Sequence, residues 1–193
     1  MAIRKKSVDT LPEVASDFVW AVSSGSHHEP HSLLGAHPHE KGWVIRALRP
    51  MAKSVSAVVD GEKVELSHLE NGLWQGYVAS KKVPDYRITT AYQDGSVWTT
   101  DDPYRHLPTI GDLDLHLISE GRHEDLWNAL GSHIHSVKGD LGLSHGTRFA
   151  VWAPNAQAVR VVGEFNSWNG IAHSMRVMGS SGVWEIFIPG VGA

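Results

Sequence analysis

Short runs of apolar and polar residues alternate between residues 42 and 103, and turn residues separate the runs. Runs rich in β-branched and aromatic residues and broken by Asp-Gly, Asn-Gly or Pro turns are typical of β-strands. Lys63 and Glu65 alternate with Val64 and Leu66, as expected for a strand with one solvated face. The pattern predicts six strands, at residues 43–48, 55–59, 63–66, 73–78, 86–92 and 96–100. Short strands at this spacing predict an all-β sandwich.

The same pattern returns later in the chain, where residues 149–152 and 159–162 are predicted as strands around a Pro154-Asn155 turn. Gly42, Pro50 and Val55 correspond to Gly146, Pro154 and Val159 at one constant shift. Trp74 and Trp184 then occupy the same position in two copies, which favours buried core positions for both. The repeat indicates two copies of one module.

The second copy is shorter than the first, because Ala193 corresponds to a position near Val83 and the counterpart of residues 84–103 is absent. The predicted fold is all-β: two tandem immunoglobulin-like β-sandwich modules joined by a short helix-containing linker, with the second module truncated. We expect an N-terminal helix and lead-in at 1–30, the first module at 31–104, the linker at 105–135 and the incomplete second module at 136–193. A sandwich without its last strands would expose a sheet edge.

Two helices are predicted outside the strand-rich regions. Thr10 and Glu13 have capping-box spacing, and apolar residues follow at helical intervals until Gly25. This helix should pack its apolar face on a neighbour. In the linker, residues 112–117 alternate as a strand would, and residues 119–130 form a helical pattern that Gly131 ends.

Composition excludes several classes of partner. With 17 Lys and Arg against 21 Asp and Glu, the net charge is -4 and no dense basic run occurs, which argues against nucleic-acid and membrane partners. The chain has no Cys, so it can form neither a disulfide framework nor a thiolate metal site. It also shows no apolar signal-peptide core. We therefore expect a cytoplasmic location.

Five histidines fall between His27 and His39, so a metal site must be weighed. Imidazole binds zinc well, but the scattered spacing, interrupted by Pro30 and Pro38, does not converge as a helical pair would. We expect no metal site and assign these residues to loops and turns. No phosphate-binding glycine loop occurs either, and we expect no cofactor.

Catalytic residues are not expected in this chain. Glycoside chemistry needs two carboxyl groups across a cleft. The adjacent or alternating pairs are Asp101 with Asp102, Asp112 with Asp114, and Glu124 with Asp125. These are better explained as solvated surface residues.

One stretch carries candidate binding chemistry. A pyranose ring stacks its apolar face on aromatic rings and bonds its hydroxyls to nearby polar groups. Trp168 follows Phe165-Asn166-Ser167 in a polar turn, where a core Trp would be unusual, so Trp168 and Asn166 are candidate glucan-binding residues.

Val151-Trp152-Ala153-Pro154-Asn155-Ala156 followed by Gly163-Glu164-Phe165-Asn166-Ser167-Trp168 resembles the signature of the glycogen-binding early-set modules of amylase-family enzymes. The resemblance implies a stacking role for Trp168. It also implies a second stacking Trp near the module's end. Trp98 in Asp94-Gly95-Ser96-Val97-Trp98 fits that role, but only in the first copy, so neither copy holds a complete site of the family type.

The His27 to His37 segment and Arg122 to Trp127 resemble the lead-in and the linker of the longer bacterial glycogen branching enzymes. The resemblance implies the non-catalytic N-terminal region of such an enzyme, which cleaves an α-1,4 bond and transfers the oligosaccharide to a 6-hydroxyl. Its implied partners are an α-glucan and the enzyme's own catalytic barrel. A stand-alone glucan-binding or regulatory module, and the N-terminus of a related debranching or trehalose-releasing enzyme, remain alternatives.

Overall fold

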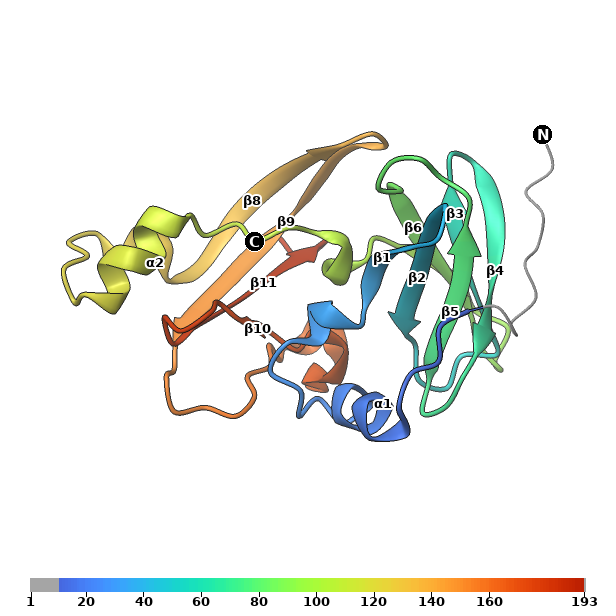
Figure 1. The fold of residues 1–193 in the computed structure, drawn as a ribbon, viewed down its shortest axis with the longest axis horizontal. Coiled ribbons are helices and arrows are strands. Elements are labelled where there is room, and N and C mark those ends of the chain that lie inside the picture. The colour runs from blue at the N-terminus through green and yellow to red at the C-terminus, as the bar shows by residue number, and fades with distance from the viewer. Residues whose placement is uncertain (1–10, 193) are drawn as a thin grey trace.

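The computed structural model describes residues 11–192, which form two sheets lying beside each other (Figure 1). The larger sheet has seven strands in the order β1-β2-β5-β4-β3-β6-β7. Its strands are β1 (Gly35–His39), β2 (Gly42–Leu48), β3 (Ser54–Val59), β4 (Glu62–His68), β5 (Leu73–Val78), β6 (Tyr86–Ala91) and β7 (Val97–Thr100). The smaller sheet has the order β10-β11-β9-β8. Its strands are β8 (Gly131–Gly139), β9 (Gly142–Trp152), β10 (Arg176–Val177) and β11 (Val183–Pro189).

The seven-stranded sheet folds over into two layers at β4. This strand pairs with β3 over five residues but with β5 only at Ser67 and His68. Because side chains alternate along a strand, β3 presents Val55, Ala57 and Val59 to one side, where they meet apolar residues of β2, β5 and β6. The six strands predicted between residues 43 and 100 are confirmed, and so is the all-β sandwich class. The additional strand β1 contains Pro38, which an edge strand tolerates because a Pro lacks only one ladder donor.

The two copies make the same contacts at corresponding positions. The indole Nε1 of Trp74 donates to the carbonyl oxygen of Arg49 at 3.2 Å, and that of Trp184 to the carbonyl oxygen of Ala153 at 3.0 Å. Each acceptor residue precedes a proline of the repeat. Both indoles are buried, with 8% and 2% of their surface exposed. The repeated sequence therefore builds the same core position twice.

The second copy departs from the first after β9. The strand predicted at residues 159–162 is wrong, because only an isolated bridge joins Arg160 to Ser174. In the first copy the corresponding strand β3 lies between β4 and β6 and bonds to both, whereas the backbone at Arg160 forms this one β-bridge. Two 3₁₀ turns follow instead, η4 (Glu164–Asn166) and η5 (Gly170–His173).

The linker also differs from its prediction. Residues predicted as a strand form helix α2 (Asp112–Ser119), and the helix predicted at 119–130 is reduced to α3 (Leu126–Ala129). Leu115 and Ile118, which lie three residues apart, pack against the buried cluster of Ile110, Ala150 and Val183, whereas Leu113 is exposed. Acidic residues in the first turn also favour a helix through its dipole. The proposed module boundaries stay a prediction, and β8 begins at Gly131, within the stretch assigned to the linker.

Helix α1 (Ser16–Ser23) lies at the junction between the two sheets, as Figure 1 shows. The helix begins later than expected, and Thr10 of the predicted capping box lies outside the described residues. Its buried Val19 and Val22 share one apolar cluster with Leu73 of the first sheet and Trp184 of the second. The apolar face of α1 therefore packs against residues of both copies, at the junction between them.

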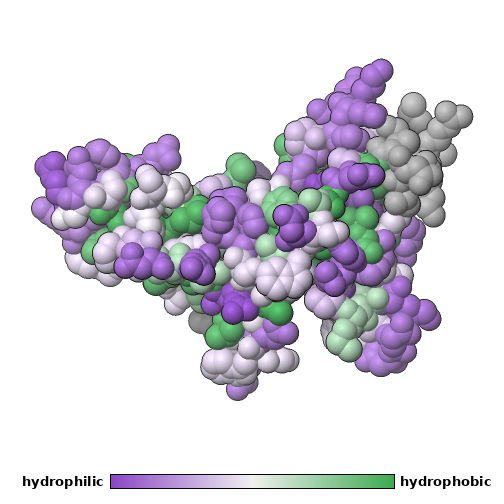
Figure 2. All heavy atoms as spheres, turned by 60° about the horizontal axis from the view of Figure 1, so that its bottom comes forward, coloured by the Kyte–Doolittle hydropathy of each residue, from purple (hydrophilic) through white to green (hydrophobic). Residues whose placement is uncertain are grey.

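Two 3₁₀ turns complete the junction, η2 (Pro30–Ser32) and η3 (Pro103–Arg105). Figure 2 shows hydrophilic residues over much of this face of the molecule, with hydrophobic ones in scattered patches between them. Of the helices within residues 11–192, none combines the length and the apolar composition needed to cross a bilayer.

Candidate functional site

Trp168 projects from a tight turn between β9 and β10. The carbonyl oxygen of Gly163 accepts the backbone N–H of Asn166 at 3.2 Å and that of Trp168 at 2.9 Å. Ser167 and Trp168 have φ values of 52° and 59°, in the left-handed region that costs free energy for residues other than glycine. The Trp168 side chain is nevertheless 68% exposed. A large aromatic residue that combines backbone strain with exposure contributes little to the fold, which favours a role in recognition.

Asn166 shapes this turn through both ends of its amide. Its Oδ1 accepts the N–H of Gly163 at 3.0 Å, and its Nδ2 donates to the carbonyl oxygen of Val161 at 2.9 Å. Nδ2 also lies 3.0 Å from Nδ1 of His173. Burial is the main reason that the pKa of His173 is lowered to about 4, so the ring is neutral near pH 7 and can accept this bond. An amide oxygen has two lone pairs, and the bond from Gly163 uses one of them.

Trp98 lies elsewhere, on the edge strand β7 of the first copy. Its side chain is 63% exposed, and its cross-strand partner is Thr90. Within residues 11–192, no hydrogen bond or ring contact joins Trp98 to the turn that carries Asn166 and Trp168. The structure therefore brings two of the three candidate residues together and leaves the third on another module.

The expectation that Asp101 and Asp102 are solvated is wrong. Asp102 is fully buried, and its two carboxylate oxygens accept the Tyr86 hydroxyl at 2.7 Å and the Tyr104 backbone N–H at 3.3 Å. The side chain of Asp101 is only 11% exposed. Glu124 and Asp125, by contrast, are exposed as expected. The adjacent carboxylates gave no sequence signal for burial, because partners such as Tyr86 and Ser144 lie far along the chain on other strands.

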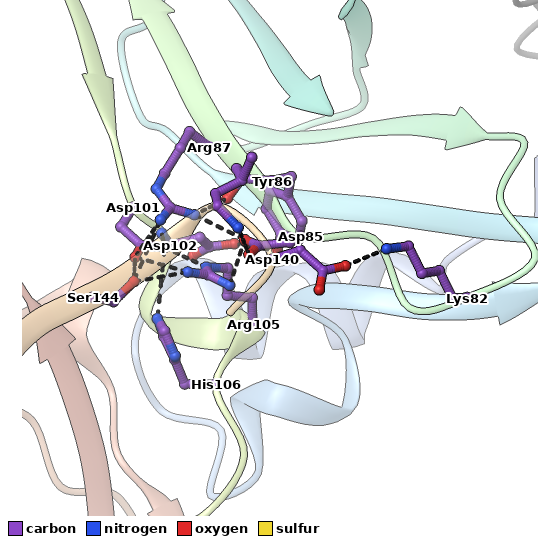
Figure 3. Close-up of polar contacts among 11 residues, drawn as sticks. Lys82, Asp85, Tyr86, Arg87, Asp101, Asp102, Arg105, His106, Asp140 and Ser144 are labelled. Atoms are coloured by element: carbon purple, nitrogen blue, oxygen red, sulfur yellow. Dashed lines mark hydrogen bonds and ion pairs between the residues drawn. The ribbon is translucent and has the colours of Figure 1, made fainter. Parts of the chain in front are cut away.

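Asp101 belongs to a polar joint, which we define as Asp85, Arg87, Asp101, Arg105 and Ser144 (Figure 3). Asp101 accepts from Nε and Nη2 of Arg105, the latter at 2.9 Å, and from the Ser144 hydroxyl at 2.6 Å. Asp85 accepts from Arg87 at 2.9 Å and from Arg105 at 2.8 Å. Ser144 lies on β9, whereas the other four residues belong to the first copy and the turn after it. The joint therefore fixes the β8–β9 hairpin to the first module.

The histidine-rich segment is spread over separate contacts. His27 stacks on His28 with ring centroids 5.0 Å apart, and His31 packs edge-on against Tyr104. His37 lies on β1, which corrects its assignment to a loop, and its Nε2 is 3.0 Å from the carbonyl oxygen of Leu34. Within residues 11–192, no three His, Asp or Glu side chains converge as metal ligands would.

Two buried histidines predict an acid-sensitive fold. Burial lowers the pKa of His31 to about 2 and that of His173 to about 4, whereas both would be near 6.5 in the unfolded chain. Below pH 6.5 the unfolded state therefore binds protons that the folded state does not. The free energy of unfolding consequently decreases as the pH is lowered. We expect a loss of about 1–2 kcal/mol per histidine between pH 7 and pH 5. Urea denaturation at pH 7, 6 and 5 measures it.

The His173→Gln variant should show a shallower pH dependence of stability than the parent chain. The variant His116→Gln, which replaces an exposed histidine of α2, should keep the parent's dependence. Equal stability of the parent chain at pH 7 and pH 5 would contradict the expectation.

Comparison with known proteins gives two family matches along the chain. Residues 15–104 match the model of the alpha-1,4-glucan branching enzyme GlgB, N-terminal domain. Residues 129–193 match carbohydrate-binding module 48, the isoamylase N-terminal domain. The two matches follow each other in the order of the two copies.

Curated relatives agree with these matches. The 1,4-alpha-glucan branching enzyme GlgB of Thermobifida fusca is 57% identical over 173 residues, which are 89% of this chain and 23% of that protein. The enzyme of the same name from Leifsonia xyli subsp. xyli is 54% identical over 189 residues, which are 94% of this chain and 25% of that protein. The chain thus spans about a quarter of the length of these relatives. The chain therefore matches, in order, the N-terminal domain of the GlgB branching enzymes and carbohydrate-binding module 48, and corresponds to the N-terminal region of its GlgB relatives.

Proposed function

We propose that this chain serves as the glucan-contacting, non-catalytic N-terminal region of a 1,4-α-glucan branching enzyme. In the whole enzyme, a catalytic barrel would cleave an α-1,4 bond and transfer the oligosaccharide to a 6-hydroxyl to form a branch. The partners of this region would be an α-glucan such as glycogen and the enzyme's own barrel. We propose the cytoplasm as the compartment, in keeping with the absence of Cys.

The exposure of Trp168 in a strained turn is the observation that carries this proposal. Its indole would stack on the apolar face of a glucose unit, while Asn166 holds the turn and offers its remaining lone pair to a hydroxyl. Trp98 would form a separate contact on β7, near a different stretch of the glucan. A single stacking residue in each copy predicts weak glucan binding. Replacing either Trp168 or Trp98 should therefore lower the affinity measurably.

Affinity electrophoresis in gels that contain amylopectin tests the proposal. We expect Trp168→Ala to bind roughly tenfold more weakly than the parent chain, which corresponds to about 1.4 kcal/mol of stacking and burial. Trp98→Ala should weaken binding to a smaller extent. Each variant is first checked for folding by circular dichroism.

Trp20→Ala is the matched control, because Trp20 is as exposed as Trp98, at 63%, but lies on α1. Its migration should equal that of the parent chain. If the parent chain is not retarded by amylopectin, or if all three variants lose retardation equally, the proposed site is wrong. The buried polar joint would then favour a bracing role for this region.

A further inference from the structure

The loop that carries Trp168 has little secondary structure of its own. Between β9 and β10 the chain makes only the two 3₁₀ turns η4 and η5 and the single bridge from Arg160 to Ser174. A stretch with so few ladder hydrogen bonds takes its shape from whatever packs against it. The contacts that could supply this shape come from segments outside the second copy.

Tyr104 of η3 is the first of these contacts. Its ring is buried, and its hydroxyl accepts the backbone N–H of Ser174 at 3.0 Å and lies 3.2 Å from the carbonyl oxygen of Ala172, to which it donates. Burial raises the pKa of this hydroxyl above its usual range, so it remains protonated and able to donate. The Tyr104 hydroxyl thus forms hydrogen bonds to the residues on both sides of His173.

The turn after α1 is the second contact. Gly25 has a φ of 68°, and a Cβ atom there would lie 2.9 Å from Cδ of Arg160 and 3.3 Å from Oγ of Ser174. Nη1 of Arg160 donates to the carbonyl oxygen of Ser24 at 3.4 Å. The backbone N–H of Val177 donates to the carbonyl oxygen of His28 at 3.0 Å. The N-terminal segment therefore lies directly against the base of the loop.

These contacts connect to Trp168 through His173 and Asn166. The carbonyl oxygen of His173 accepts the N–H of Val161 at 3.1 Å, and Nδ1 of its ring faces the amide of Asn166. Asn166 in turn fixes Gly163, whose carbonyl oxygen accepts the N–H of Trp168. A displacement at Tyr104 would reach the indole through this series of bonds.

We propose that Tyr104 and the turn at Gly25 are positioning residues, which hold the Trp168 loop of the second copy in its binding conformation from outside that copy. The proposal rests on the proposed glucan site at Trp168. In this proposal, the first copy and its lead-in contribute to glucan binding without contacting the sugar themselves. The second module would then bind as part of this two-module unit.

The test combines glucan affinity with a direct signal from the indole. The full chain is labelled with 5-fluorotryptophan, and the ¹⁹F resonances of Trp168 and Trp74 are assigned from the variants Trp168→Phe and Trp74→Phe. In Tyr104→Phe, we expect the Trp168 resonance to shift or broaden, the Trp74 resonance to stay, and amylopectin affinity to fall about fivefold.

Thr147→Val is the matched control, since it also removes one hydroxyl of a buried residue, which donates to the carbonyl oxygen of Val191 at 2.7 Å and not to the Tyr104 or Trp168 segments. It should destabilise the fold to a similar extent without moving the Trp168 resonance or the affinity. An unmoved Trp168 resonance in Tyr104→Phe would overturn the proposal, as would an equal change in both variants.

A second pair of variants covers the case in which Tyr104→Phe does not fold. Gly25→Ala pushes on Arg160, whereas Gly61→Ala has the same left-handed strain, at a φ of 81°, with no atom within 4 Å of the added Cβ. Only Gly25→Ala should move the Trp168 resonance. If that resonance moves but the parent chain shows no amylopectin retardation, the positioning role stands and the glucan site is wrong.

Discussion

Replacing Glu185 with glutamine is expected to lower the free energy of unfolding by about 3–5 kcal/mol, because it leaves a buried guanidinium without its counter-charge. Glu185 is fully buried on β11, and its Oε2 accepts from Nε and Nη2 of Arg176 at 2.9 and 2.8 Å. Its Oε1 accepts the backbone N–H and the hydroxyl of Thr109 at 3.2 and 2.6 Å. Urea denaturation followed by circular dichroism at pH 7 measures the loss.

A double variant distinguishes the loss of the Glu185–Arg176 ion pair from a general loss of core packing. Because the cost comes from an unpaired charge, Glu185→Gln combined with Arg176→Gln should lose less stability than Glu185→Gln alone. Thr109→Ala is the smaller control, since it removes one hydrogen bond and should cost about 1 kcal/mol. Additive losses in the double variant would show that the ion pair does not couple the two residues.

Replacing Asp101 with asparagine is expected to cost about 3 kcal/mol and to loosen the attachment of the β8–β9 hairpin to the first module. The variant would place an amide opposite Arg105 and weaken the bond to Ser144. Hydrogen exchange of the backbone amide of Leu141, which donates to Asp85 at 2.7 Å, reports on the hairpin directly. That amide should exchange faster in Asp101→Asn than in the parent chain.

The same carboxylate adds a second acid-sensitive contribution. Although burial opposes ionisation, the adjacent His106 ring and hydrogen bonds from Arg105 and Ser144 hold the pKa of Asp101 well below its usual range. Its stabilisation is therefore complete above the unfolded pKa of about 4 and is lost as the pH falls below that value. The parent chain should lose more stability than Asp101→Asn between pH 4 and pH 2. Lys63→Ala is the control for Asp101→Asn, because it removes an exposed ion pair with Glu65 within β4 and should leave Leu141 exchange and stability unchanged.

The strands of the first module could be predicted because the sequence signals that define them lie within a few residues of each strand. Alternation at period two and turns such as Asp60-Gly61 give strand positions directly, and on β6 every second residue is buried. The two copies were also predictable, since Trp74 and Trp184 recur with the same prolines and glycines. Trp168 could also be selected as a candidate from nearby residues, because a large aromatic residue in a polar turn has no local structural role.

The linker and the junction were not predictable in the same way. Residues 112–117 alternate like a strand, but no neighbouring strand pairs with them, and packing against the cluster of Ile110, Ala150 and Val183 favours the helix. The burial of Asp101 could not be inferred, because Ser144 lies 43 residues further along the chain and reaches Asp101 only when the hairpin docks. Tyr104 carried no signal of its contact with Ser174, which lies 70 residues further along the chain.

The sequence by itself determined the all-β class, the strands of the first module, the tandem repeat and the candidate aromatic residues, because periodicity and turn chemistry act over a few residues. Only the tertiary structure decided how the copies join, which carboxylates are buried and which residues hold the Trp168 loop. These features depend on contacts between segments far apart in the chain, where burial and charge pairing outweigh local preference.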